Sequence, residues 1–456
     1  MTTRMKTTRM TTRRPRLLIA GLLIILAGLP SAQETDRVVL ISVDGLMPAT
    51  YTGPSAARIP NLRRLKTEGT SAAGVIGVLP SNTFPAHTTL VSGVGPAVHG
   101  IVDNAILDPE GRSRGGWYWY ADDVKVPTLL TAGEAADRRV AAINWPATVG
   151  LDVSLLIPDI VRSGHPESLA LLRALSSPEL FDAAARARGG TVTWPLTDAD
   201  WTAMARFALE SHDADLVALH LLAVDGAQHA RGAGSAEARR AIESVDAHVG
   251  TILESIERSE RADRTYVVVV SDHGFSNLEG ALQPNALFRQ EGLIEVNAAG
   301  RVTEWQAYFH ASGGSGFVYL KDPNDAALRQ RVGALLAGLT EDPAYGIASL
   351  WTADDLAARQ AHPEAAFGIG MRPGWYALGG SDVLTPAAPS AGGHGFPPEY
   401  PDLHASLIIR GPGVTAARDL GIVRMTQIGP TLARLLGVRL GPDADEPLDV
   451  PTGAAP

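Results

Sequence analysis

The chain has 456 residues, of which 45% are hydrophobic and 19% charged, and this balance is that of an ordinary soluble globular protein. It contains no cysteine, which excludes disulfides and thiolate ligands, so any bound metal must be held by nitrogen and oxygen atoms. The formal net charge of −10 argues against tight, sequence-independent binding to nucleic acids, and we expect no stable nucleic-acid partner.

The first 32 residues have the three sections of a secretory signal peptide. Six basic residues and no acid come first, the apolar run 17–29 follows, and small residues close the segment. Thirteen apolar residues are too few to span a bilayer comfortably, so we expect no permanent membrane span after cleavage. Removal of residues 1–32 would leave a secreted or periplasmic protein with 33 basic against 49 acidic side chains, a formal charge of −16.

Short apolar runs alternate with helical patterns along the rest of the chain. The runs that read as strands buried on both faces lie at residues 38–43, 140–143, 216–222, 266–270 and 405–409. Apolar residues at helical spacing make residues 237–257 the clearest amphipathic helix. This alternation predicts an α/β fold with a mostly parallel central sheet and helices on both faces. In such a sheet, ligands bind beyond the carboxyl ends of the strands.

No internal repeat and no linker divides the chain, so we expect residues 33–440 to form one α/β domain. Residues 277–390 are richer in glycine, proline and mixed polarity, and we interpret them as an inserted cap. Residues 441–456 are predicted to form a loosely ordered C-terminal tail.

One hydroxyl residue stands where a helix is predicted to begin. Residues 80–93 leave an apolar run and enter a short helical pattern, and Pro85 is tolerated in a first helical turn, so Thr83 is expected just before the helix N-terminus. Free backbone N–H groups and the positive end of the helix dipole favour an anion such as phosphate there. Taken alone, Thr83 is more simply explained as a helix cap.

Acids and histidines follow several of the predicted strands. They are Asp44 after residues 38–43, Asp225 and His229 after residues 216–222, Asp272 and His273 after residues 266–270, and His394 in a glycine-rich turn before the last strand. Each alone is a common turn, capping or core residue. Three carboxylates and three imidazoles at one edge of a sheet would be costly unless cations neutralise the carboxylates, so together they favour metal binding.

These motifs resemble the nucleotide pyrophosphatase/phosphodiesterase family of the alkaline phosphatase superfamily. The matching segments are Ile-Ser-Val-Asp-Gly at 41–45, Asn-Thr-Phe-Pro-Ala-His at 82–87, His-Gly-Ile-Val-Asp-Asn at 99–104, Asp225 with His229, Asp-His-Gly at 272–274 and His-Gly at 394–395. They occur in the order of the family, and the resemblance extends over residues 37–438. It implies an alkaline-phosphatase-like α/β fold in which residues 33–440 form the catalytic domain.

The resemblance further implies two zinc ions (Zn2+). One would be held by Asp225, His229 and His394, and the other by Asp44, Asp272, His273 and the Thr83 oxygen. Coordination to a divalent cation lowers the pKa of a hydroxyl, so Thr83 would attack phosphorus and form a phosphothreonine that is then hydrolysed. Asn104 and the backbone N–H of Phe84 would bind the charge on the non-bridging oxygens.

The predicted substrate is a small-molecule phosphodiester or pyrophosphate, with nucleotides among the candidates. Residues 144–148 look like the Trp-Pro segment of the diesterases and offer none of the Lys or Arg side chains that monoesterases place around phosphate. Phe84 lies where the family has one wall of a nucleobase slot, and it is equally consistent with a core residue. The second wall, a tyrosine, has no match in residues 151–162, which leaves other phosphodiesters open.

Two alternatives stay open beside a phosphodiesterase. A phosphomonoesterase, or another phosphate or phosphonate ester hydrolase, uses the same scaffold, whereas a sulfatase would need Cys or Ser in place of Thr83. The other is a secreted metal-binding protein without turnover, and a hydroxyl among the ligands argues against it. His87, His99 and His310 are expected to pack or hydrogen-bond, and the sequence leaves the oligomeric state open.

Overall fold

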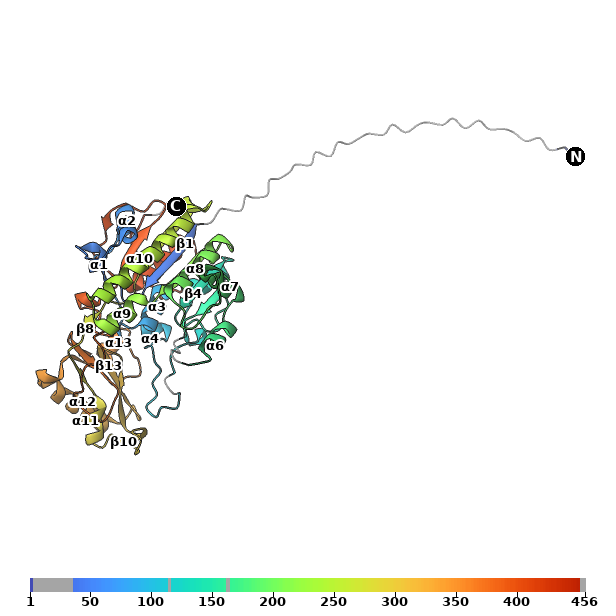
Figure 1. Cartoon of the computed structure of the whole chain (residues 1–456). Coiled ribbons are helices and arrows are strands. Elements are labelled where there is room, and N and C mark those ends of the chain that lie inside the picture. Colours follow the sequence, from blue (N-terminus) through green and yellow to red (C-terminus); the bar gives the residue numbers. More distant parts are fainter. Residues whose placement is uncertain (3–35, 114–115, 161–164, 452–456) are drawn as a thin grey trace. The chain divides into compact units, whose positions relative to one another are not determined.

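A computed structural model of the chain describes residues 1–2, 36–113, 116–160 and 165–451 (Figure 1). Residues Thr35–Pro456 form one unit by their contacts. The predicted signal peptide, apart from its first two residues, lies outside the described part of the chain. Among the helices that the structure describes, none is both long enough and apolar enough to cross a bilayer.

The central element is a sheet of eight strands. In spatial order these are β19 (Arg418–Asp419), β2 (Thr70–Ser71), β18 (Leu407–Arg410), β7 (Thr265–Val270), β1 (Arg37–Val43), β6 (Leu216–Leu221), β4 (Val140–Trp145) and β5 (Leu155–Pro158). The five from β7 to β5 pair in parallel, as predicted. The strands β1, β4, β6 and β7 are buried along their whole length, which agrees with cover on both faces.

The strand expected at residues 405–409 is β18, and it runs antiparallel to its neighbours β7 and β2. The chain reaches β18 from His394, which lies beside Asp225 at the carboxyl edge of the parallel strands. A strand that starts from this edge has to run back across the sheet. The sheet is therefore mixed, with a parallel centre.

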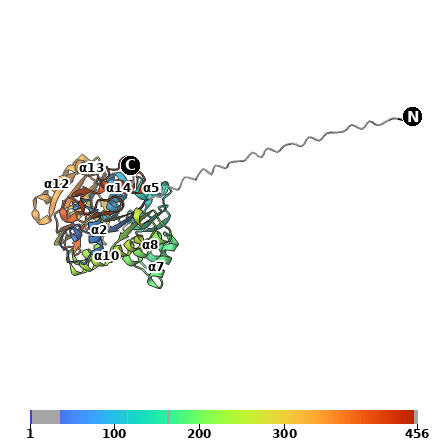
Figure 2. The same ribbon diagram turned by 90° about the horizontal axis from the view of Figure 1, so that it is seen from above.

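Helices cover both faces of this sheet, and Figure 2 shows α5 and α14 on one side and α2, α8 and α10 on the other. One face packs Val39 and Ile41 of β1 against α2 (Pro60–Glu68), α7 (Pro178–Arg188), α8 (Asp198–Glu210) and α10 (Ala236–Glu257). The other packs Val38 and Leu40 against α3 (Thr83–Ser92), α5 (Leu129–Ala135) and α14 (Ile428–Leu436). Four further helices of this part of the chain are α1 (Ala49–Thr52), α4 (Pro96–His99), α6 (Ser168–Ala174) and α9 (Ala223–Arg231). The predicted amphipathic helix is α10, whose first turn is capped by the Ser235 side chain.

Residues 277–390 contain a second, antiparallel sheet with its own apolar core. Its strands are β12 (Ala307–Ala311), β13 (Ser315–Leu320), β15 (Phe367–Met371) and β14 (Ile347–Thr352), accompanied by α11 (Pro284–Gln290), α12 (Ala326–Glu341) and α13 (Ala353–Ala358). Phe309, Val332 and Ile369 are buried in its core. The role of this segment as a cap stays a prediction.

Four two-stranded pairs complete the described strands. They are β10 (Ile294–Val296) with β11 (Val302–Trp305), β16 (Trp375–Ala377) with β9 (Gly280–Leu282), β17 (Gly392–Gly393) with β8 (Ser276–Asn277), and β20 (Ile422–Arg424) with β3 (Gly74–Ile76). The pair β17–β8 matters for the site, because His394 follows β17 directly.

The segment after Gly441 is held more firmly than predicted. Leu448 and Val450 are buried against the core that contains α14. The Arg434 guanidinium donates to the carbonyl oxygens of both residues, at 2.8 and 2.9 Å. The expectation of a loosely ordered tail is therefore wrong for residues 441–451, and residues 452–456 lie outside the described part.

Candidate active site

Three adjacent parallel strands bring most of the predicted site residues to one edge of the sheet. Asp44 follows β1, Asp272 and His273 follow β7, and Asp225 and His229 lie on α9, which follows β6. Because β7, β1 and β6 are neighbours that run in one direction, their carboxyl ends meet. His394 reaches the same edge from β17, so the structure brings all six predicted acids and histidines together.

Asp225, His229 and His394 form the first group of potential metal ligands, with ligand atoms within 4.8 Å of one another. The Nε2 atoms of His229 and His394 lie 3.3 and 3.8 Å from Asp225 Oδ1. Their Nδ1 atoms donate to backbone carbonyls, that of His229 to Gly392 at 2.9 Å and that of His394 to Ser81 at 3.1 Å. These hydrogen bonds assign the proton to Nδ1, so the Nε2 lone pairs face Asp225.

Asp44, Asp225 and His273 form the second group, again within 4.8 Å. His273 Nε2 lies 3.4 Å from Asp44 Oδ1 and 3.1 Å from Asp272 Oδ2. Its Nδ1 donates to the Gly274 carbonyl at 3.0 Å, which leaves Nε2 facing the carboxylates. Asp225 belongs to both groups, so the two adjoin.

The side chains of both groups fit a divalent cation. Three of their buried atoms have no hydrogen-bond partner, namely Asp44 Oδ1, Asp225 Oδ1 and His273 Nε2, and the same holds for Oδ2 of the adjacent Asp272. Burial, and then the charges of Asp272 and Asp225, raise the pKa of Asp44 well above its usual range. Unpaired buried carboxylates are costly, and a cation among them removes this cost. Carboxylate oxygens and imidazole nitrogens are ligands that zinc takes.

The helix α3 begins at Thr83, so Thr83 is the first helical residue instead of the one just before it. Asn82 takes the cap position without a side-chain capping bond. Thr83 is half-buried, and within the described part of the chain neither its hydroxyl nor its backbone N–H has a hydrogen-bond partner. The preceding Asn82 accepts from His394 at 3.0 Å. His87 donates to the Thr83 carbonyl at 2.8 Å and lies 3.7 Å from Asp272. Contacts on both sides of Thr83 thus lead to His394 of the first group and to Asp272, which lies beside His273 of the second group.

Asn104 lies next to the start of α3, and its amide makes one contact there. Its Oδ1 accepts from the Phe84 N–H at 2.8 Å, whereas its Nδ2 has no partner among the described residues. The Phe84 N–H, predicted to bind substrate, is therefore already paired. The free N–H at this helix start is that of Thr83.

The structure corrects the prediction for the Phe84 side chain. Its ring is 0% exposed and packs with Ile101 and Ala147. The rings of Trp117 and Trp119 meet it edge-on, with centroids 5.3 and 5.7 Å away. Because no face of the ring is exposed, Phe84 does not offer a wall to a substrate, and the alternative interpretation as a core residue holds.

Three histidines that the sequence analysis left outside the metal sites have polar partners elsewhere, whereas His220 Nε2 lies 3.1 Å from Oδ2 of the ligand Asp44. His87 Nε2 lies 2.8 Å from Ser42 Oγ, His99 Nε2 lies 3.0 Å from Thr89 Oγ1, and His310 Nε2 lies 3.0 Å from Asp103 Oδ2.

The sequence reasoning assigned no role to two buried carboxylates, Asp159 and Asp103. Asp159 follows β5 and is 5% exposed, and burial raises its pKa to about 7. The sequence does mark Asp159, because it comes directly after an apolar run, and the same pattern identified Asp44. Asp103 is the other, and its partners lie in distant parts of the chain.

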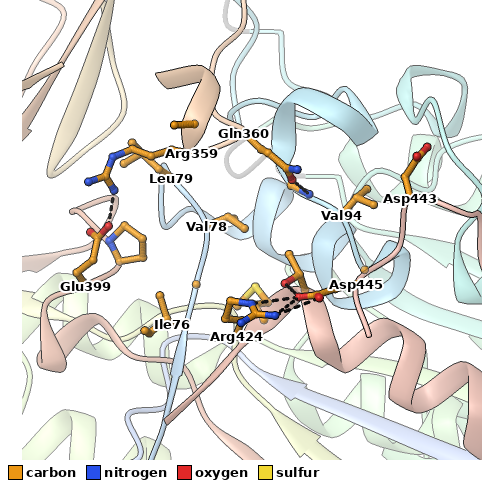
Figure 3. Close-up of a pocket in the computed structure, with 17 residues that line it drawn as sticks. Ile76, Val78, Leu79, Val94, Arg359, Gln360, Glu399, Arg424, Asp443 and Asp445 are labelled. Atoms are coloured by element: carbon orange, nitrogen blue, oxygen red, sulfur yellow. Dashed lines mark hydrogen bonds and ion pairs between the residues drawn. The ribbon is translucent and has the colours of Figure 1, made fainter. Parts of the chain in front are cut away.

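A cavity of about 510 Å³ lies at the opposite end of α3, where Gly93 and Val94 line it (Figure 3). Two of its arginines are paired with acids that also line it, Arg359 with Glu399 and Arg424 with Asp445. None of the predicted site residues lines this cavity. The candidate site is instead the cluster at the edge of the sheet.

Residues 38–396 match the profile of the family described as type I phosphodiesterase / nucleotide pyrophosphatase. One relative is ectonucleotide pyrophosphatase/phosphodiesterase family member 1 of Mus musculus, which is 24% identical over 54% of this chain and 24% of that protein. Another is family member 7 of Homo sapiens, which is 27% identical over 57% of this chain and 53% of that protein. The bis(5'-adenosyl)-triphosphatase ENPP4 of Bos taurus is 25% identical over 59% and 56%. The matches thus span between a quarter and about half of these relatives.

The fold is similar to that of solved structures of this family. An inactive variant of murine ectonucleotide pyrophosphatase / phosphodiesterase 5, in complex with AMP, superposes with a TM-score of 0.63 at 17% identity, over 89% of this chain and 96% of that one. The human counterpart superposes with the same TM-score at 16% identity, over 90% and 97%. The chain therefore belongs to the type I phosphodiesterase / nucleotide pyrophosphatase family, a family of phosphodiester hydrolases within the alkaline phosphatase superfamily.

Proposed function

We propose that this chain is a secreted or periplasmic phosphodiesterase / nucleotide pyrophosphatase that binds two zinc ions and forms a covalent phosphothreonine on Thr83. The observation that carries the proposal is the position of Thr83. Its hydroxyl has no partner in the described part of the chain, it opens α3, and its neighbours Asn82 and His87 contact His394 and Asp272. A helix N-terminus with free N–H groups favours a phosphoryl group at this place.

The first proposed metal site is the first group, and the second combines Asp44 and His273 of the second group with Asp272 and Thr83. Asp225, His229 and His394 would hold one zinc ion, and Asp44, Asp272, His273 and the Thr83 oxygen the other. Zinc supplies a Lewis acid that lowers the pKa of a coordinated hydroxyl and neutralises charge on the phosphoryl group. The Nδ1 hydrogen bonds of the three histidines would keep their Nε2 atoms directed at the ions.

The chain's own residues account for the two steps of hydrolysis. The Thr83 hydroxyl gives its proton to water as its oxygen bonds to phosphorus, the bond from phosphorus to the leaving alcohol or phosphate breaks, and the leaving oxygen takes a proton from water. The oxygen of a second water molecule then bonds to phosphorus while the bond from phosphorus to the Thr83 oxygen breaks, which releases the phosphate product and returns a proton to Thr83. Asn104 Nδ2 and the Thr83 N–H are the free donors that would bind the non-bridging oxygens.

We propose a small-molecule phosphodiester or pyrophosphate as the substrate. The relative named bis(5'-adenosyl)-triphosphatase and the solved complex with AMP favour nucleotides. Residues 144–148, without Lys or Arg, favour a diester over a monoester. The buried ring of Phe84 means that another part of the chain has to recognise a base.

Hydrolysis of bis(p-nitrophenyl) phosphate and p-nitrophenyl phosphate, with and without a chelator, tests this proposal. We expect faster turnover of the diester and loss of activity in chelator. Thr83→Ala should lower kcat by at least about 10³-fold while zinc remains bound, and Thr83→Ser should keep part of the activity because it keeps a hydroxyl. Acid quenching should trap labelled phosphate on Thr83 only when the hydroxyl is present.

Three results would decide against the proposal. An active Thr83→Ala variant would remove the nucleophile assignment. A preference for the monoester would favour the phosphomonoesterase alternative. Tight zinc binding without turnover of any ester would favour the metal-binding alternative.

A further inference from the structure

A buried carboxylate, Asp103, joins separate parts of the chain beside the candidate site. It lies in the loop after α4 and is 2% exposed. Its Oδ1 accepts from Asn82 Nδ2 at 2.8 Å and from the Asn104 N–H at 2.7 Å. Its Oδ2 accepts from His310 Nε2 at 3.0 Å and from the Ser312 hydroxyl. His310 lies on β12 and Ser312 follows it, so the second sheet supplies half of these donors.

Four donors use all four acceptor positions of a carboxylate, which is the arrangement of the charged form. Burial opposes this charge, but the hydrogen bonds from His310 and Ser312 and the charges of His310 and His362 together hold the pKa of Asp103 below its usual value. The carboxylate is therefore a fixed acceptor to which each neighbouring donor must point.

This fixed acceptor determines how the Asn82 amide is turned. Because Nδ2 of Asn82 points to Asp103, its Oδ1 faces His394 and accepts from His394 Nδ1 at 3.0 Å. The proton on Nδ1 leaves the Nε2 lone pair directed at Asp225. The Ser81 carbonyl, at 3.1 Å, is a second acceptor for the same N–H.

We propose that Asp103 is a positioning residue for the metal centre, which orients His394 through Asn82 and anchors the backbone of Asn104. The inference rests on the proposed role of His394 as a metal ligand. His310 and Ser312 connect this network to the second sheet, so residues of the inserted segment contribute to the site through Asp103.

The test is the zinc affinity of the full-length chain, measured by competition with a chromophoric chelator. Asp103→Asn should weaken the binding of one zinc ion about 10-fold, at the lower end of the range for supporting residues, because the Ser81 carbonyl still holds the His394 N–H. Asn82→Ala removes the residue between Asp103 and His394 while Asp103 remains, and it should weaken the binding of the same zinc ion. It serves as the test if Asp103→Asn does not fold.

Asp246→Asn is the matched control. Asp246 is also buried, and it accepts from the backbone N–H groups of Asn61 and Leu62, away from the ligand groups. This variant should lower the thermal unfolding midpoint without a change in zinc affinity.

The inference would be overturned if Asp103→Asn and Asn82→Ala both bound zinc with an affinity within about 2-fold of that of the wild type, because supporting residues usually have a larger effect. An equal loss of zinc affinity in Asp246→Asn would also overturn it, because general destabilisation would then explain the effect. A wild-type chain that binds zinc but hydrolyses no phosphodiester would overturn the proposed function alone, and one that binds no zinc would overturn both.

Discussion

The Asn104 side chain makes two contributions that substitution can separate. Its Oδ1 accepts from the Phe84 N–H at 2.8 Å, and its Nδ2 is the donor proposed to bind the phosphoryl group. Asn104→Asp keeps an acceptor for Phe84 and replaces the donor by a charged oxygen. Asn104→Ala removes both.

The expected magnitudes differ between the two variants. Loss of one donor to the transition-state oxygen costs about 2.7–4 kcal/mol, or a factor of about 10²–10³ in kcat. Asn104→Asp should reach or exceed this range, because its charge repels phosphate. Asn104→Ala leaves the Phe84 N–H unpaired, which should lower the free energy of unfolding by about 1 kcal/mol, whereas an aspartate at a helix start keeps that bond.

Turnover and stability are therefore expected to rank the two variants in opposite order. Turnover of bis(p-nitrophenyl) phosphate should fall more in Asn104→Asp than in Asn104→Ala, and urea unfolding should show the alanine variant as the less stable. Asn104→Asp with a kcat within about 10-fold of the wild type, outside the range for a lost donor, would refute the role of Nδ2. Equal stabilities of the two variants would refute the capping contact.

Three further predictions concern buried titratable groups and the metal. Burial raises the pKa of Asp159 to about 7, above its unfolded value of about 3.9, so its ionisation lowers stability as pH rises from about 4 to 7. Asp159→Asn should be more stable than the wild type at pH 8 by up to about 4 kcal/mol and no more stable at pH 4, and urea midpoints that differ equally at both pH values would contradict this. Burial lowers the pKa of His99 to about 3, so below pH 6.5 this imidazole takes up a proton in the unfolded chain but not in the folded one. The free energy of unfolding of the wild type should therefore fall by about 2 kcal/mol between pH 7 and 5 relative to that of His99→Gln, as urea unfolding at the two pH values would measure. Chelator should abolish hydrolysis and lower the thermal midpoint, and zinc should restore both, whereas an unchanged midpoint would speak against cations in the two ligand groups.

The sequence predicted the site best where local pattern and sheet topology act together. An apolar run followed by an acid marks a strand end, and parallel neighbours bring Asp44, Asp225 and Asp272 to one edge. The direction of β18 was not predictable from its composition, because it depends on the edge at which the preceding chain arrives.

Other features escaped because they depend on distant partners. Asp103 meets His310 and Ser312 across 207 and 209 positions of sequence, and no local pattern marks such a network. The burial of Phe84 depends on Trp117 and Trp119, whose rings reach it from another loop. The pairing of the Phe84 N–H likewise required a fold that brings Asn104 beside it.

The chain forms the second sheet between His229 and His394, so His394 follows this long segment, whereas its proposed co-ligands Asp225 and His229 precede it. A cation shared by the three would therefore clamp the two ends of this loop together, and closing a long loop reduces the conformational entropy of the unfolded chain. In a protein without a single thiol, the metal would thus act as a reversible crosslink. Proteolytic resistance between these ligands is then expected to depend on free zinc in the surroundings.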